Sequence, residues 1–278
     1  MNRAIFSIFM GDICDHQSTP DKHFKPGAAK IYTELFDKII YNHQAYANHI
    51  GAQYMLASAD AEWTEFYRQI HKKYPNITNY NIINYYKFYM AEKLTKTYDE
   101  VLYVDFDAFF YTNDNFFDYH WCQKFNVLYH PLPVAPSKEA AWSTDVGIPK
   151  LRLRKAYFIQ LALERLGIDP MEADMGMANT GVMGYNKSSV GILNYWDTFK
   201  ELMPLMYPEN DDCAVDNEVF FCAAAIRNNL EINCLEDDWN YKAKKPPFKG
   251  KICHFTNKEH MKDFFEEDNF RPSRTEYN

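Results

Sequence analysis

The segment 101–107 constrains the fold of this chain more than any other part of the sequence. It reads Val-Leu-Tyr-Val-Asp-Phe-Asp, so four apolar residues lead directly into two carboxylates that are two positions apart. A short continuous apolar run is typical of a strand that is buried on both faces of an α/β sheet. Alternate residues of a strand share a face, so we expect Asp105 and Asp107 on one side at the edge of the sheet. In open α/β sheets, ligands bind just beyond the carboxyl ends of the strands.

The aspartate pair predicts a cation site. Two carboxylates held close together repel each other unless a proton or a cation lies between them. Mg²⁺ and Mn²⁺ suit oxygen ligands, and such ions usually bind substrate phosphates as well. We therefore expect Asp105 and Asp107 to bind a divalent metal ion.

The composition limits the class of protein. With 278 residues, of which 47% are hydrophobic, the chain can form one large domain or two small ones. Its net charge of -8 argues against a nucleic-acid-binding protein. The six cysteines form no close CxxC pair, which indicates free thiols in a reducing compartment. No apolar run is long enough to cross a bilayer, so we expect a cytoplasmic protein, in a host cytoplasm if the source is viral.

Strands and helices alternate along the chain, which predicts βαβ units and a mainly parallel sheet. We expect strands at about 4–10, 53–57, 101–107, 126–129, 232–235 and 251–255, and a turn leading into a strand at 179–186. We expect helices at about 28–49, 61–75, 81–96, 151–166, 188–206 and 216–230, with Asp60 and Ser188 as caps. The segment 131–149 is predicted to be a long loop that forms an acceptor wall or lid, and the end of the chain after Phe265 a polar tail.

Three other classes of protein carry similar letters or similar binding chemistry. Phosphatases of the haloacid-dehalogenase class use Asp-x-Asp with the first aspartate as nucleophile, but their motif closes the first strand. The string Asp-Phe-Asp-Ala-Phe-Phe at 105–110 is similar to one in lesion-bypass DNA polymerases. Those enzymes need a basic DNA groove and a Ser-x-Asp-Glu motif, which this chain lacks. A non-catalytic module that binds sugars or nucleotides remains open as well.

The segment 98–107, Tyr-Asp-Glu-Val-Leu-Tyr-Val-Asp-Phe-Asp, resembles the metal-binding strand of GT-A glycosyltransferases, and in particular the retaining family 8, which uses UDP-sugars. The resemblance continues at 179–183, Asn-Thr-Gly-Val-Met, and at 216–218, Asp-Asn-Glu, which stands where the family has an Asp-Gln-Asp-like triplet. It extends to the Trp239-Asn240 pair and to His254, which stands at the place of the third metal ligand. After this histidine the family often has a Gly and a Lys-Pro-Trp segment. Here Lys258 or His260 could take the role of that lysine in binding the β-phosphate.

The resemblance implies a hexosyltransferase-type enzyme with a single GT-A domain at 1–278. Its nucleotide-binding half would span about 1–110 and its acceptor half about 111–265, followed by the tail at 266–278. The donor would be a nucleoside-diphosphate sugar, most simply a UDP-sugar, and the acceptor a glycan or another hydroxyl compound. The cofactor would be Mn²⁺ (or Mg²⁺), held by Asp105, Asp107 and His254.

The resemblance also assigns roles to other side chains. Asp216 and Asn217 would be catalytic, with Glu218 as a further candidate nucleophile. The expected substrate-binding residues are Gly11, Asp12, Lys87, Asp105, Asn179, Thr180, Gly181, Asp216, Asn217, Trp239 and Lys258. For Gly11 and Asp12 the assignment is positional, because they follow the first predicted strand and could hold the base and the ribose.

Overall fold

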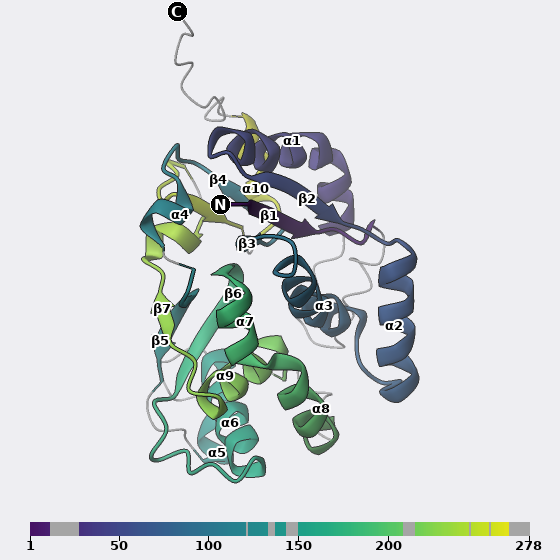
Figure 1. The fold of residues 1–278 in the computed structure, drawn as a ribbon, viewed down its shortest axis with the longest axis vertical. Coiled ribbons are helices and arrows are strands. Elements are labelled where there is room, and N and C mark those ends of the chain that lie inside the picture. Colours follow the sequence, from purple (N-terminus) through teal and green to yellow (C-terminus); the bar gives the residue numbers. More distant parts are fainter. Residues whose placement is uncertain are drawn as a thin grey trace, which may run out of the picture.

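The structure is a computed structural model that describes residues 1–11, 28–120, 122–132, 137–142, 150–207, 215–244, 246–255 and 257–266 (Figure 1). Its strands are β1 (Arg3–Ile8), β2 (Gln53–Ala57), β3 (Glu100–Val104), β4 (Ala108–Phe110), β5 (Phe125–Pro131), β6 (Gly176–Tyr185), β7 (Ile232–Cys234), β8 (Tyr241–Lys242) and β9 (Ile252–His254). Its helices are α1 (Ala28–His49), α2 (Ala61–Lys73), α3 (Asn79–Leu94), α4 (Phe116–Tyr119), α5 (Lys138–Trp142), α6 (Lys150–Arg165), α7 (Lys187–Leu193), α8 (Tyr195–Met206), α9 (Asn217–Arg227) and α10 (His260–Glu266), with a 3₁₀ turn at Asp237–Asn240.

A six-stranded sheet in the order β2-β1-β3-β6-β5-β7 forms the centre of the molecule. Strands β2, β1 and β3 are parallel, as are β5 and β7, while β6 runs antiparallel to both of its neighbours. The predicted α/β class with a mainly parallel sheet is therefore confirmed. The segment 179–186 was expected to begin with a turn, but β6 is continuous from Gly176 to Tyr185.

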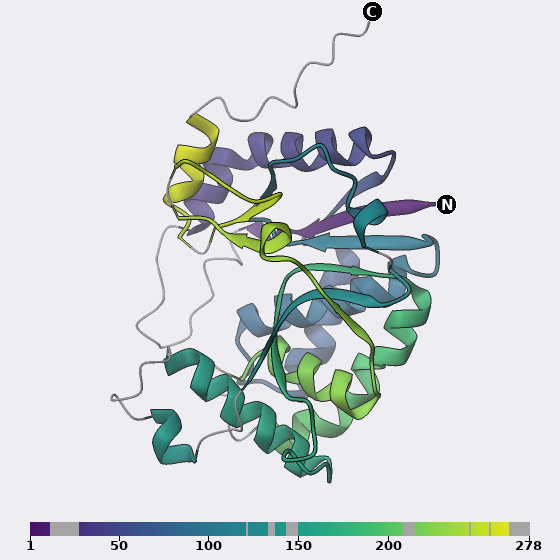
Figure 2. The ribbon, with the colours of Figure 1, turned by 90° about the vertical axis from the view of Figure 1, so that its left-hand side faces the viewer.

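Helices cover both faces of this sheet (Figure 2). All five residues of β3 are buried, as its apolar sequence predicts. Val101 and Tyr103 pack into the core that includes residues of α3 and α9. Leu102 and Val104 pack on the opposite face, into the core that includes residues of α1.

A second, three-stranded sheet in the order β4-β9-β8 lies beyond the end of β3 and was not predicted. Strands β4 and β9 pair antiparallel with Ala108 opposite His254. The backbone N–H of Phe255 donates to the carbonyl of Asp107 over 2.9 Å. This pairing brings His254 next to the two aspartates that follow β3.

Asp105 and Asp107 lie in a turn and not within the strand, which differs from the expected alternation. The N–H of Ala108 donates to the carbonyl of Asp105 over 2.9 Å and closes this turn. The chain thus leaves the central sheet between the two carboxylates and enters the second sheet directly after them. The pairing of β4 with β9 supplies the physical reason for the bend.

The prediction of one helix at 188–206, capped by Ser188, was wrong. Asn186 caps α7 through a reciprocal pair of hydrogen bonds with Ser189. Asn194 then adopts a left-handed backbone with φ of 45°, which ends α7, and α8 begins at the next residue. Asn tolerates this conformation better than most residues, so the break has a local cause.

The predicted long loop and the predicted polar tail are described only in part. Within the predicted loop at 131–149 the structure describes a short helix, α5, while 133–136 and 143–149 lie outside the described residues. The predicted polar tail from 267 to 278 lies outside them as well. The division near residue 110 stays a prediction. No helix in the described part of the chain is long and apolar enough to cross a membrane.

Candidate metal and phosphate site

Asp105, Asp107 and His254 meet at the carboxyl edge of β3. One ligand atom from each lies within 4.8 Å of the others. Nε2 of His254 is 3.6 Å from Oδ2 of Asp105 and 3.5 Å from Oδ1 of Asp107. Two carboxylates and an imidazole nitrogen suit Mn²⁺ well and Mg²⁺ less well, because imidazole is a softer ligand than oxygen.

Asn240 orients the imidazole. Nδ1 of His254 donates to Oδ1 of Asn240 over 3.0 Å, which leaves the lone pair of Nε2 directed at the two carboxylates. Burial lowers the pKa of His254 and outweighs the opposing effect of Asp105, so the ring is neutral at pH 7. A neutral imidazole held through its second nitrogen is the usual arrangement of a metal ligand.

Gly181 of β6 completes the wall of this centre. A Cβ at this position would lie 2.3 Å from Cε1 of His254 and 2.9 Å from Oδ2 of Asp105, so only glycine fits. The backbone of Gly181 accepts from the N–H of Asp105 over 2.7 Å. Its own N–H donates over 3.1 Å to Oδ1 of Asn179, which also accepts from Asn240 over 3.2 Å. Asn240, Gly181 and Asn179 therefore hold the ligand atoms in place, and this set of ligands fits a divalent cation.

Two lysines neutralise the aspartates. Nζ of Lys87, whose side chain is 5% exposed, lies 2.8 Å from Oδ1 of Asp105. Lys258 pairs with Oδ2 of Asp107 and donates to the carbonyl of Phe255 over 2.8 Å. Burial alone would raise the pKa of Asp105, but Lys87 and His254 outweigh it, so the pKa of Asp105 is lowered. Asp105 is consequently ionised at neutral pH and available as a ligand.

A second charged group, the lysine–carboxylate cluster, consists of Lys155 on α6, Asp216 at the N-cap of α9 and Glu218 on α9. Nζ of Lys155 lies 2.6 Å from Oδ2 of Asp216 and also pairs with Oε2 of Glu218. Asp216 caps α9 by accepting from the backbone N–H groups of Glu218 and Val219 over 2.9 and 3.4 Å. Burial alone would lower the pKa of Lys155, but the two carboxylates outweigh it and raise that pKa.

The lysine–carboxylate cluster and the Asp-Asp-His centre are joined through two consecutive residues of β6. Thr180 accepts from the amide of Asn217 over 2.7 Å, and its N–H donates to Oε1 of Glu218 over 3.3 Å. Gly181, the next residue, packs on His254. Tyr80 lies close enough to carboxylates of both groups for their charges to affect its pKa. Burial is the main cause of its raised pKa, and carboxylates of both groups add to the shift.

Trp239 lies in the hydrophobic core. Its side chain is fully buried and packs edge-on against Phe116 and His120, with the ammonium of Lys251 4.7 Å from its ring. The predicted substrate contact of Trp239 stays a prediction, whereas its neighbour Asn240 contacts His254. Gly11 follows β1 with a left-handed φ of 58°, and Asp12 lies outside the described residues, so the proposed base and ribose contacts remain predictions.

The sequence alone did not point to Lys155 or Tyr80, and the pair Trp239-Asn240 did not show which of the two side chains contacts the centre. A signal for Lys155 was present, because it lies three and four residues before the buried Phe158 and Ile159. A lysine on the apolar stripe of a helix needs a buried partner.

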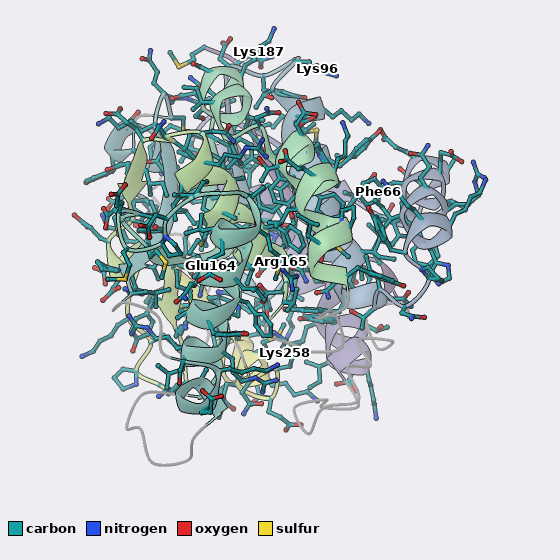
Figure 3. The ribbon with its side chains drawn as sticks, turned by 90° about the horizontal axis from the view of Figure 1, so that it is seen from below. Phe66, Lys96, Glu164, Arg165, Lys187 and Lys258 are labelled. Carbon is teal, nitrogen blue, oxygen red and sulfur yellow. The ribbon has the colours of Figure 1, made fainter. Side chains whose placement is uncertain are left out.

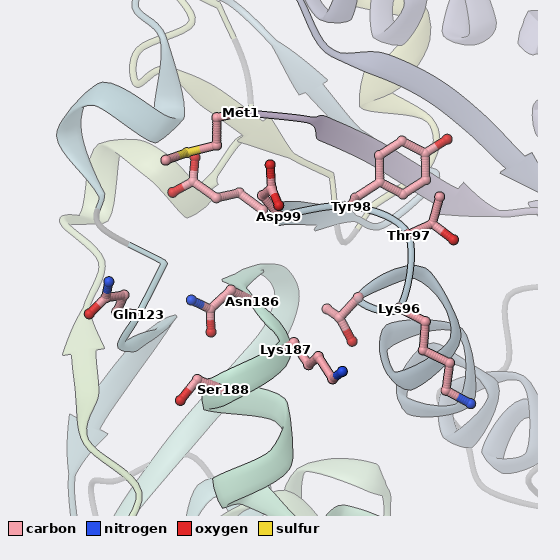
Figure 4. A pocket seen from close by; sticks show the side chains of 11 residues that line it. Met1, Lys96, Thr97, Tyr98, Asp99, Gln123, Asn186, Lys187 and Ser188 are labelled. Carbon is pink, nitrogen blue, oxygen red and sulfur yellow. The ribbon is translucent and has the colours of Figure 1, made fainter.

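A cavity of about 800 Å³ lies elsewhere in the molecule. It is lined by Thr95, Lys96, Asp99, Lys187 and Ser188, among others (Figure 4). Figure 3 shows Lys96 and Lys187 at the opposite end of the molecule from Lys258. This cavity is therefore separate from the Asp-Asp-His centre.

The geometry defines an α/β protein with an Asp-Asp-His centre and two lysines at the carboxyl edge of its sheet. No protein-family model and no curated protein sequence matches the chain. It is similar to solved structures of glycosyltransferases. Mouse xyloside xylosyltransferase 1 in its apo form has a TM-score of 0.44 and 10% identity, over 92% of this chain and 98% of that chain.

Two further structures are similar over nearly their whole length. Galactosyltransferase LgtC, in complex with donor and acceptor sugar analogs, has a TM-score of 0.43 and 11% identity, over 96% of this chain and 95% of that chain. A glycosyltransferase involved in the glycosylation of the major capsid of PBCV-1 has a TM-score of 0.39 and 13% identity, over 95% and 100%.

Proposed function

We propose that this protein is a metal-dependent glycosyltransferase of the GT-A type. It would move a sugar from a nucleoside-diphosphate sugar, most simply a UDP-sugar, to a hydroxyl group of a glycan or another acceptor. The observation that carries the proposal is the convergence of Asp105, Asp107 and His254 with Lys87 and Lys258 at one edge of the sheet.

The charges of this edge suit a diphosphate. The two aspartates and the two lysines cancel in formal charge, and His254 is neutral, so a bound divalent cation would leave two positive charges. The diphosphate of a nucleotide sugar carries two negative charges. Lys87 and Lys258 would each exchange an aspartate oxygen for a phosphate oxygen, since an ammonium group binds phosphate readily.

The residues of the centre would act by binding and orientation. Asp105, Asp107 and Nε2 of His254 would hold Mn²⁺ or Mg²⁺, and Asn240 would keep the imidazole in position. When bound, the cation supplies Lewis-acid stabilisation of the negative charge on the departing diphosphate. Lys87 and Lys258 would add to that stabilisation from the protein side.

The sugar would lie between the centre and the lysine–carboxylate cluster. Asn179, Thr180 and Asn217 would bind its hydroxyl groups. Asp216 and Glu218, with Lys155 between them, carry one net negative charge by formal count, which would stabilise positive charge on the reacting carbon. In a retaining reaction the departing phosphate could take the proton of an acceptor that attacks from the same face.

The test is a thermal-shift screen of nucleotides and nucleotide sugars with and without Mn²⁺, followed by assays of sugar release and transfer. We expect UDP with Mn²⁺ to stabilise the protein more than either alone, EDTA to abolish turnover, and the product to retain its anomeric configuration by NMR. No metal-dependent nucleotide binding would contradict the proposal. A trapped phosphoaspartate would indicate a phosphatase, and tight UDP binding without turnover of any donor would indicate a binding module.

A further inference from the structure

Lys155 is a buried cation that joins three elements of the proposed sugar site. It belongs to α6, its side chain is 10% exposed, and its ammonium group pairs with carboxylates on α9. One of these, Glu218, also accepts from the backbone N–H of Thr180 on β6. Lys155 therefore connects α6, α9 and β6 at the point where the sugar is proposed to lie.

The hydrogen bonds show how the two carboxylates differ. Both oxygens of Asp216 are engaged, Oδ1 by the first N–H groups of α9 and Oδ2 by Lys155. The side chain of Asp216 is 7% exposed, whereas that of Glu218 is 16% exposed. Among the described residues, Oε1 of Glu218 accepts from the N–H of Thr180 and Oε2 pairs with Lys155, and each carboxylate oxygen can accept a further hydrogen bond from a ligand. Asp216 thus holds Lys155 at the start of α9, and Glu218 is the more accessible carboxylate.

The energetics argue against a purely stabilising role for Lys155. A buried ion pair is expensive to desolvate, and well-packed apolar residues are often as stable or more stable in its place. Lys155 lies on the apolar stripe of α6, where leucine or methionine would pack without this cost. A charged residue at this place therefore points to a requirement for its charge.

We propose that Lys155 is a positioning residue of the transfer reaction, which fixes the Glu218 carboxylate toward the sugar and keeps the net charge of the lysine–carboxylate cluster at one negative unit. This inference rests on the proposed function. Without Lys155, Asp216 and Glu218 would repel each other and would move apart or bind a proton. The preorganised charge opposite the reacting carbon would then be lost, although the metal and the diphosphate would still bind.

The experiment compares Lys155→Gln with wild type in steady-state kinetics and in binding of UDP and Mn²⁺. We expect kcat to fall about 100-fold, the scale seen when one preorganised electrostatic group is removed. The dissociation constants of UDP and Mn²⁺ should change less than about threefold, because Lys155 contacts neither. Lys200→Gln is the matched control. Lys200 is 67% exposed and pairs with Asp197 on the same helix, away from the lysine–carboxylate cluster, so its loss should leave kcat unchanged.

A second variant tests whether Lys155 acts by placing a positive charge between the carboxylates or by supporting the fold. Lys155→Ala opens space beside the partly exposed Glu218, and added ethylammonium should raise its kcat at least tenfold in a saturable way, since the amine can enter between the carboxylates. Unchanged kcat in Lys155→Gln, or a parallel loss of UDP and Mn²⁺ binding in both variants, would overturn the positioning role while leaving the proposed function intact. Absence of nucleotide-sugar turnover in the wild type would overturn both.

Discussion

Two buried histidines, His254 and His43, lie next to Ala108, and they differ in the groups that face their ring nitrogens. His254 is opposite Ala108 in the ladder of β4 and β9, and its Nε2 faces two carboxylates. His43 of α1 is fully buried and donates from Nε2 to the carbonyl of Ala108 over 2.7 Å. Its Nδ1 accepts from the hydroxyl groups of Ser7 and Tyr54 over 3.1 and 3.3 Å.

The comparison shows that partners, and not burial, distinguish a candidate metal ligand from a structural histidine. Burial lowers the pKa of both rings, that of His43 to about 4. Both nitrogens of His43 are engaged by neutral groups of the fold, so nothing is left for a ligand. His254 donates from Nδ1 to Asn240, and its Nε2 faces the two carboxylates of the acidic edge.

The largest effect is expected from removing a carboxylate of the centre. Asp107→Asn should reduce metal-dependent transfer by about 1,000-fold or more, because loss of the metal removes several kcal/mol of transition-state stabilisation. The melting temperature should stay near that of wild type. Steady-state kinetics and Mn²⁺ titration measure the change. Asp197→Asn, which alters a carboxylate that is 68% exposed, serves as the control. Equal turnover in both variants would remove the metal from the mechanism.

The two histidines should respond in opposite ways to the same substitution. His254→Gln should weaken Mn²⁺ binding at least tenfold with a small change in stability. His43→Gln should leave Mn²⁺ binding unchanged and lower the free energy of unfolding by about 1–3 kcal/mol, since it disturbs a buried hydrogen-bond network. Calorimetric Mn²⁺ titration and urea unfolding compare them. If His254→Gln instead lowered stability more and His43→Gln weakened Mn²⁺ binding more, His254 would be a structural residue and not a metal ligand.

A smaller effect is expected from Asn240. Asn240→Leu removes the acceptor that holds Nδ1 of His254 and should weaken Mn²⁺ binding about 10–100-fold, the usual cost of losing such support. Trp239→Phe is the comparison, because its ring lies in the core and packs against Phe116 and His120. It should reduce stability and leave the affinity for Mn²⁺ as it is. If Trp239→Phe weakens Mn²⁺ binding as much as Asn240→Leu does, the orienting role of Asn240 is not specific.

The smallest effect concerns pH and His43. In the unfolded chain His43 binds a proton below about pH 6.5, whereas the folded protein resists this until about pH 4. Stability is therefore complete above pH 6.5 and is lost as the pH falls toward 4, by about 2 kcal/mol between pH 7 and pH 5 for this group. Urea unfolding without metal should show this slope in wild type and a shallower one in His43→Gln. Identical slopes would mean that His43 is not neutral in the folded state.

The sequence predicted the acidic edge because its signals are local. The apolar run of β3 and the two carboxylates behind it are adjacent in the chain, and most predicted elements between β1 and β3 are present. The small sheet could not be predicted, since the pairing of Ala108 with His254 depends on register between distant segments. Lys155 depends on the packing of α6 on α9. The sequence could not show that Trp239 is buried, because an aromatic residue next to a site has the same sequence pattern as one in the core.

The ladder between β4 and β9, which places Ala108 opposite His254, also sets the order in which the centre assembles. While the chain is being synthesised, both aspartates leave the ribosome long before the histidine does. Neither the imidazole nor Lys258 can reach them until β9 has emerged and docked beside β4. A product that ends before β9 would therefore present the two aspartates with Lys87 but without His254 and Lys258, and it would bind the proposed cation weakly.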